Sequence, residues 1–398
     1  MRKSILEWFA WGCLLCSSSA WADPDDTLNL IVGAGVMHDN NLFKAPAGLE
    51  RSDEITTTTL GLNFDKEYSL QRIKVDASMT DYRYQDNDYL DYTGKNLNAA
   101  WLWKLSPSLY GNLSTSYLET MNSFADYRAL LPERRRNLRT TKNSNFGVEW
   151  EAFGPLHLIS NVSHYNLENS EVFVQESNYT AKTGEIGLKY VTSAQSSLSL
   201  VQRKSNGDYP REANPATLLD SGYEQSDTEA RFIWSPTIKS TLFGRVSYLD
   251  RTYDHFSERN YAGYVGSLDF NWGATEKVSV LFRAARDLNV FQDPSNSFDS
   301  YSSYFKSDIF SVLPTWDITE KTRLKLRLSR EKRDYEGTIV NGFPLREDRI
   351  KYLGATLEWD PTRNINVNLS YLKQSRDSNL QNFDYDSSTY RLSVILNF

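Results

Sequence analysis

An alternating hairpin, repeated along nearly the whole chain, is the feature that most limits how this sequence can fold. The clearest copies are residues 229–250 ("EARFIWSPTIKSTLFGRVSYLD"), 267–288, 311–332 and 354–375. Each copy has an alternating run that ends on or just before Trp, a tight polar turn with Pro, Gly or Asp, and a second alternating run. Alternation with a period of two sends successive side chains to opposite faces of a strand, so each copy predicts a β-hairpin.

The same frame recurs in four more segments, with Tyr190 and Phe64 in place of Trp in two of them: residues 59–78, 97–119, 146–165 and 187–204. Eight hairpins supply sixteen strands. An opening strand at 28–40 and a closing strand in "TYRLSVILNF" (389–398) raise the predicted total to about eighteen. The even number returns both ends of the chain to one side, as single-chain bacterial barrels require.

The connections between the hairpins are long, polar and rich in Asn, Asp, Ser and Tyr, whereas the turns within them are short. Short turns at one end and long loops at the other are typical of a transmembrane β-barrel. We therefore predict an all-β fold: an antiparallel up-and-down barrel with short periplasmic turns and long extracellular loops. A propeller or a β-helix also repeats, but neither predicts such unequal connections.

Tryptophan gives an independent indication of the same architecture. Seven Trp residues follow the N-terminal segment, and each lies at or just before a short turn. Aromatic side chains gather where membrane meets water, so these residues predict a periplasmic aromatic girdle. The girdle comprises Trp101, Trp103, Trp150, Trp234, Trp272, Trp316 and Trp359.

The first 22 residues have the form of a signal peptide. Arg2 and Lys3 precede a short apolar stretch, and "AWA" (20–22) fits a signal-peptidase site, so the predicted barrel domain is 23–398. Both cysteines of the chain, Cys13 and Cys16, lie in the segment that would be removed. The mature chain would then have neither a thiol nor a disulfide.

Beyond residue 22 no apolar run is long enough for a membrane-spanning helix. The formal net charge of −7 disfavours binding to nucleic acid. The sequence therefore predicts a location in the outer membrane of a Gram-negative bacterium, in contact with membrane lipid and lipopolysaccharide.

If the apolar positions face lipid, the alternate positions face the lumen. In "TRLKLRLS" (322–329) the leucines would point outward, and Arg323, Lys325 and Arg327 would line the inner wall. By the same phase we expect Arg231, Arg245, Arg283 and Arg391 to face inward. These cations either pair with inward acids such as Glu149, Glu185 and Glu358, or form a track for an anionic or polyhydroxylated solute.

The loop 121–139 carries the longest basic stretch, with Arg134, Arg135, Arg136 and Arg139. Two interpretations stay open: a solvated surface loop, or a constriction loop that folds into the barrel.

Catalysis has little support in the sequence. The four histidines (His38, His157, His164 and His255) form no recognisable motif, and Asp-Asn pairs such as those in "HDNN" (38–41) commonly form turns rather than a Ca²⁺ site. We predict no enzymatic activity, no metal and no cofactor.

The opening "GAGVMHDNNLF" (33–43), the hairpin repeat and the terminal Phe398 resemble the EpsL-type outer-membrane proteins of the β-barrel porin-2 family, which are associated with exopolysaccharide biosynthesis. The resemblance implies passage of a secreted polysaccharide, with a periplasmic export partner beside the barrel. It also implies that the last strand, with Tyr390 and Phe398, is the signal read by the barrel-assembly machinery. It supplies no transport residues.

We therefore expect a channel that takes part in exopolysaccharide export. The alternatives are a general or solute-specific diffusion porin, an outer-membrane enzyme acting on lipid or glycan, and an adhesin or scaffold with a blocked lumen.

Overall fold

A computed structural model describes residues 27–125, 135–213, 220–290, 304–337 and 345–398. The predicted signal peptide (1–22) and Arg134 lie outside the described residues. The strands are β1 (Leu28–Asp39), β2 (Asp53–Tyr68), β3 (Gln71–Tyr84), β4 (Tyr92–Ser106), β5 (Leu109–Met121), β6 (Leu138–Phe153), β7 (Leu156–Asn169), β8 (Tyr179–Val191), β9 (Ser197–Asp208), β10 (Gly222–Thr237), β11 (Ser240–Tyr253), β12 (Tyr261–Gly273), β13 (Val278–Val290), β14 (Tyr304–Thr319), β15 (Thr322–Glu336), β16 (Glu347–Thr362), β17 (Ile365–Ser378) and β18 (Tyr385–Asn397).

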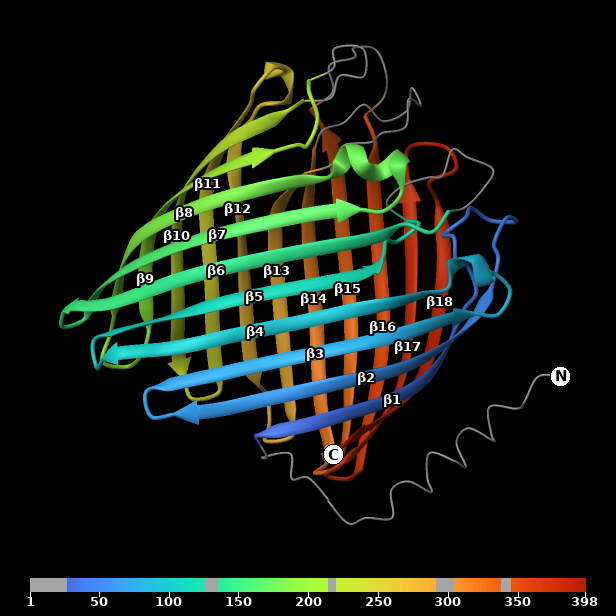
Figure 1. The fold of residues 1–398 in the computed structure, drawn as a ribbon, viewed down its shortest axis with the longest axis horizontal. Coiled ribbons are helices and arrows are strands. Elements are labelled where there is room, and N and C mark those ends of the chain that lie inside the picture. Colours follow the sequence, from blue (N-terminus) through green and yellow to red (C-terminus); the bar gives the residue numbers. More distant parts are fainter. Residues whose placement is uncertain (1–26, 126–134, 214–219, 291–303, 338–344) are drawn as a thin grey trace.

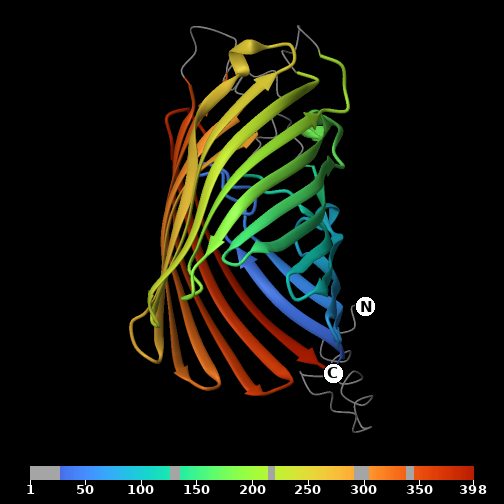
Figure 2. The same cartoon turned by 90° about the vertical axis from the view of Figure 1, so that its left-hand side faces the viewer.

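The eighteen strands form one closed antiparallel barrel (Figure 1, Figure 2). Each strand pairs with its neighbours in sequence, and β1 pairs with β18 from Ile31↔Asn397 to Asp39↔Thr389. The terminal residue completes the seam, because the backbone N–H groups of Leu30 and Phe398 each donate to the other's carbonyl, at 2.7 and 2.8 Å. Closure pairs the backbone groups that an open edge would leave exposed to hydrocarbon. The predicted barrel is confirmed.

The connections alternate between short and long, as the sequence predicts. Eight turns of two to five residues join the hairpins, whereas the other connections span six to sixteen residues. The turn at Gly154 uses a positive φ of 60°, which glycine adopts without strain. In the described parts of the long connections there are three 3₁₀ turns: Asp88–Leu90, Val172–Ser177 and Ser257–Arg259. No helix among the described residues has the length and apolar character needed to cross a membrane.

The outer wall carries a belt of exposed apolar side chains, for example Leu200, Val246, Leu328 and Leu353. Six of the seven girdle tryptophans are also 43–54% exposed near the short turns. Trp103 differs, since it is only 7% exposed and stacks on Phe146 with ring centroids 6.0 Å apart. A water-soluble protein rarely exposes so large an apolar surface, and a membrane barrel requires it.

The buried hydrophobic side chains of the barrel gather inside its long-loop end. Leu42 and Phe43, from the β1–β2 connection, pack there against Ile55, Tyr84 and Leu90. Tyr209, Tyr223 and Tyr253 form a second buried cluster, with Tyr179 against it. The long-loop end of the lumen is therefore partly filled by side chains, which leaves the short-turn end as the place for a cavity.

Candidate functional site: a charged cavity in the lumen

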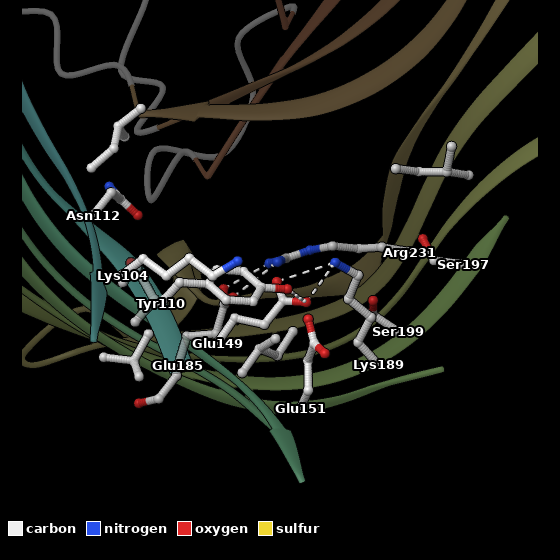
Figure 3. A pocket seen from close by; sticks show the side chains of 18 of the residues that line it. Lys104, Tyr110, Asn112, Glu149, Glu151, Glu185, Lys189, Ser197, Ser199 and Arg231 are labelled. Atoms are coloured by element: carbon white, nitrogen blue, oxygen red, sulfur yellow. Dashed lines mark hydrogen bonds and ion pairs between the residues drawn. The ribbon is translucent and has the colours of Figure 1, made fainter. Parts of the chain in front are cut away.

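A cavity of about 1420 Å³ lies against the inner wall of the barrel (Figure 3). Its lining runs from Glu67 on β2 to Asp269 on β12, and most of its residues lie close to the short turns. A cavity that touches eleven consecutive strands of a closed barrel lies on their concave side. It therefore belongs to the short-turn half of the lumen.

One group of polar side chains in the cavity centres on Glu149 of β6. Its carboxylate accepts hydrogen bonds from Tyr110 Oη at 2.9 Å and from Lys189 Nζ at 2.9 and 3.1 Å. His157 Nδ1 lies 2.6 Å from the same carboxylate. Strands β5 to β8 bring these four side chains together, and the charge of Glu149 is shared among fixed donors.

A second group forms a continuous chain of ion pairs along β8 to β13. Arg231 holds Glu185 through two parallel hydrogen bonds of 2.7 and 2.9 Å, and it also pairs with the buried Glu229. Arg203 bonds the same Glu185 at 3.1 Å. Arg245 continues the chain, lying 3.7 Å from Glu229 and 2.5 Å from Asp287. Bidentate Arg–carboxylate geometry fixes both partners in place.

Figure 3 shows how the two groups meet in the cavity: Arg231 and Lys189 extend toward Glu149 and Glu185 from the β8–β10 side. The lining carries both signs, with Arg72, Lys104, Lys189, Arg231 and Arg245 among the cations and Glu67, Glu149, Glu151, Glu185 and Asp269 among the acids. The wall therefore presents donors and acceptors side by side instead of a single-sign field.

The seven basic residues expected to line the lumen fall into two kinds. Five have an acidic partner: Arg231 and Arg245 as above, Arg283 with Asp269 at 3.7 Å, Arg323 with Asp317 at 2.6 Å, and Lys325 with Glu358 at 2.5 Å. Arg327 instead lies over the ring of Tyr352, 4.6 Å from its centroid. Neither Arg327 nor Arg391 forms an ion pair within the described part of the chain.

The basic ladder of β15 is thus largely neutralised by its neighbours. The adjacent strands place Asp317 opposite Arg323 on one side and Glu358 opposite it on the other. Sequence alternation identified the cations but not these pairings, because the register between strands cannot be read along one strand.

The described part of the basic loop leans over the lumen. Phe124 packs edge-on against Phe43 with centroids 4.9 Å apart, and the Ala125 carbonyl accepts a 2.5 Å hydrogen bond from Arg376 of β17. Arg135 lies 3.5 Å from Glu171, and Arg136 donates to the Asp91 carbonyl. Arg139 is half-buried at the start of β6.

A third feature of the long-loop end is a buried ion pair that the sequence did not single out. Arg346 holds Asp348 through bonds of 3.0 and 2.6 Å, both side chains being at most 1% exposed. Arg376 approaches the same carboxylate at 3.6 Å. Arg346 also lies over Tyr335 and Phe383, at 4.4 and 4.0 Å.

Among the residues that the structure describes, one cluster has the composition of a metal site: Asp220, Asp254 and His255 in the long connections. Asp220 already accepts from the backbone N–H groups of Ser221, His255 and Phe256 at 2.8–3.2 Å. Partial loss of hydration raises the pKa of Asp254, and the negative charge of Asp220 raises it further. These hydrogen bonds explain the buried Asp220 as a residue that stabilises the loop.

The closing strand places the two predicted assembly residues at different levels. Tyr390 is 52% exposed and tilts against Tyr371, with centroids 4.9 Å apart. Phe398 lies at the seam with β1. Their role as a signal stays a prediction.

Comparisons with known proteins agree with this geometry. Residues 241–398 match the family model described as "Putative beta-barrel porin 2". A search of curated proteins finds no relative. The chain is also similar to two solved structures from Pseudomonas aeruginosa. OccK2 (OpdF) in complex with glucuronate is 12% identical, with a TM-score of 0.51 over 94% of this chain and 98% of that one. OccK9 (OpdG) is 13% identical, with a TM-score of 0.50 over 93% and 98%.

These likenesses concern the fold, and together with the apolar outer belt they identify an outer-membrane β-barrel of porin-like architecture from a Gram-negative bacterium. The exopolysaccharide association expected from the sequence finds no support in them. They agree better with the diffusion-porin alternative.

Proposed function

We propose that this protein is a solute-specific diffusion channel of the outer membrane, selecting small polar solutes that bear hydroxyl or carboxylate groups. The observation that carries the proposal is the cavity at the short-turn end, with its fixed and nearly balanced charges. Eighteen strands enclose a bore wider than side chains from the wall alone can fill.

The paired charges favour selection by hydrogen bonding over selection by net charge. Donors such as Lys189 and Arg231 are held in place by Glu149 and Glu185, and they reach the cavity beside acceptors such as Glu151. A sugar or hydroxy acid exchanges its hydration shell for such groups, whereas a simple ion sees little net field. The long-loop end adds a size limit, because Leu42 and Phe43 fold inward there.

The test is conductance and solute flux through the purified barrel in planar bilayers and liposomes. We expect measurable conductance with weak ion selectivity. A monosaccharide, or a uronate such as glucuronate, should be taken up faster than an amino acid of similar size with an apolar side chain. Glu149→Gln together with Lys189→Gln should slow the sugar more than it lowers the KCl conductance. Absence of current, or equal slowing of every solute, would overturn the proposal.

Passage of exopolysaccharide, the narrower reading implied by the resemblance, ranks second. The specific observation in its favour is the long polar inner wall shared by β8 to β13. Against it, the buried aromatic clusters leave less room for a polymer at the long-loop end. Exclusion of polyethylene glycols of graded size separates the two: a polymer channel should admit chains longer than a disaccharide.

A further inference from the structure

The outer wall of the barrel carries an exposed group of four cations on β15 and β16, strands that lie side by side in Figure 1. Arg330 is paired in register with Lys351, and Lys332 with Arg349. We call these four residues the cationic square. Their positions alternate with the inward residues Ser329, Glu331 and Ile350, so they point away from the lumen.

Two members of the square lack an acidic partner. Lys332 pairs with Asp334 at 2.8 Å, and Lys351 with Asp377 at 3.3 Å. Among the described residues, Arg330 and Arg349 form no ion pair. Asp308 lies in register with Lys332, but Arg286 already holds it through two 2.6 Å bonds. Asp377 is in register with Arg349, and Glu347 lies two residues from Arg349 on the same face. Four cations therefore lie beside the three carboxylates of Asp334, Asp377 and Glu347, and the square keeps a small excess of positive charge.

The outer wall at β3 to β5, further round the barrel, is different. Arg83 pairs with Asp81 and Asp91, at 2.6 and 3.2 Å, and Lys95 pairs with Glu119 at 3.0 Å. These cations are neutralised within the protein. Residues in register on paired strands are about 5 Å apart, so four like charges in a square repel one another unless an anion lies between them.

The depth of the square identifies the anion that it would meet. Lys351 is eight residues from the girdle residue Trp359 on β16. At about 3.3 Å per residue and a tilt of about 40°, this separation corresponds to about 20 Å along the membrane normal, close to the upper border of an apolar band about 25 Å tall. The charged headgroups of the outer leaflet lie at that border.

An apolar strip lies beside the square and continues below it. Phe310 is in register with Arg330, and Leu328 with Leu353; these three side chains are 49–55% exposed. A groove of about 440 Å³ is lined by Phe310, by all four cations and by the acids Asp308 and Glu331. Asp308 is already held by Arg286 and Glu331 by Arg333, so the four cations remain the groups available to an anion there. The surface thus offers cations for a phosphate and, beneath them, an apolar wall for acyl chains.

We propose that the cationic square is a binding site for the phosphate groups of a phosphorylated, multiply acylated glycolipid, the lipid A portion of lipopolysaccharide. Arg330 and Arg349 bind phosphate oxygens through their planar guanidinium groups, and Lys332 and Lys351 add point charges. The acyl chains lie along Phe310, Leu328 and Leu353. The site lies on the outside of the wall, so it is independent of what passes through the lumen.

The first experiment measures the glycolipid that remains on the barrel after purification from outer membranes in mild detergent, by native mass spectrometry. The variant is Arg330→Gln with Arg349→Gln, which removes only the two unpaired cations. The matched control is Arg83→Gln with Lys95→Gln, which removes two paired cations from the outer wall at β3 and β4. We expect the variant to lose about tenfold or more of the bound lipid A, the equivalent of the usual strength of charge-assisted hydrogen bonds, and the control to lose little.

The second experiment uses the unaltered protein, so it does not depend on a variant that folds. Thermal unfolding is followed in detergent with added lipid A, with enzymatically dephosphorylated lipid A, and with inorganic phosphate alone. We expect stabilisation by lipid A and much less by the other two additives. Equal stabilisation by dephosphorylated lipid would show acyl packing only, and equal stabilisation by inorganic phosphate would show an adventitious ion only. Either result, or equal lipid retention by variant and control, overturns the proposal.

Discussion

The two halves of the lumen are built from the same alternating strands, but their inward side chains differ in exposure to water. Near the short turns, Arg323 and Asp317 form an ion pair with both side chains almost half exposed. Near the long loops, Arg346 and Asp348 form an ion pair that is at most 1% exposed. The difference arises because loop residues such as Phe43 and Ala125 fold over the upper half, whereas the short turns are too brief to cover the lower half.

This contrast predicts opposite consequences for similar mutations. A charge in the covered half has no water to replace its partner, so its removal affects stability. A charge in the open half remains hydrated, so its removal affects the electrostatics of the channel more than the fold.

The largest expected effect comes from Asp348→Ala. The change leaves Arg346 and Arg376 buried without their carboxylate, which should lower the free energy of unfolding by about 3–5 kcal/mol. Urea unfolding of the barrel in lipid vesicles measures it. Asp317→Asn is the matched control in the open half and should cost less than about 1 kcal/mol. Similar losses in both variants would mean that the two halves do not differ in burial.

Opening the covered half is the next test. Leu42→Ala with Phe43→Ala removes two buried anchors of the β1–β2 connection and should cost about 2–5 kcal/mol of local packing per side chain. The connection should then leave the lumen, and single-channel conductance should rise. Leu49→Ala, at a 62% exposed position of the same connection, should leave conductance unchanged. A stable double variant with unaltered conductance would argue that the connection does not narrow the path.

In the open half we expect a change of selectivity with little change of stability. Glu358→Gln releases Lys325 and weakens the restraint on Arg323, so the anion-to-cation permeability ratio should rise by about 1.5- to 5-fold, equivalent to about 0.2–1 kcal/mol per exposed pair. Arg323→Gln with Lys325→Gln should lower the ratio. Reversal potentials in a KCl gradient measure both. If neither variant moves the reversal potential, the ladder only solvates the wall.

The smallest effect concerns pH and the loop that contains Asp254. Partial loss of hydration and the negative charge of Asp220 raise the pKa of Asp254, so the charged form of its carboxyl is disfavoured in the folded loop. The loop is therefore most stable below the unfolded pKa, and that stability is lost as the pH rises through the raised folded value. Hydrogen exchange of the His255 and Phe256 amides, corrected for intrinsic rates, should show greater protection in acid. Asp254→Asn should abolish this pH dependence, and an unchanged profile would refute the assignment.

Much of the fold could be predicted because the strands and turns of a membrane barrel produce patterns that are visible in short stretches of the sequence. Each hairpin repeats a period of two, and most short turns follow a tryptophan such as Trp234 or Trp316. The opening and closing strands, predicted at 28–40 and within 389–398, are observed as Leu28–Asp39 and Tyr385–Asn397. Because lipid lies on one face of each strand and the lumen on the other, the alternation shows which face each residue occupies.

The candidate site could be predicted only in part. Alternation assigned Arg231, Arg245 and Lys325 to one face, but it could not reveal that Glu185, Asp287 and Glu358 neutralise them. The cationic square was missed for a different reason: Arg330 and Arg349 lie on consecutive strands but face outward, and the charges sought in the sequence were those facing the lumen.

The sequence by itself determined the class of fold, the number of strands and which side chains share a face, because these follow from the two-residue period and from the need to pair every backbone group in a membrane. Only the tertiary structure decided which charges meet and which part of the lumen stays open. Those properties depend on the stagger between neighbouring strands and on loops that fold back across the barrel. Phe124, Ala125 and Arg376 meet there although hundreds of residues separate the last from the others, and no local pattern encodes such a contact.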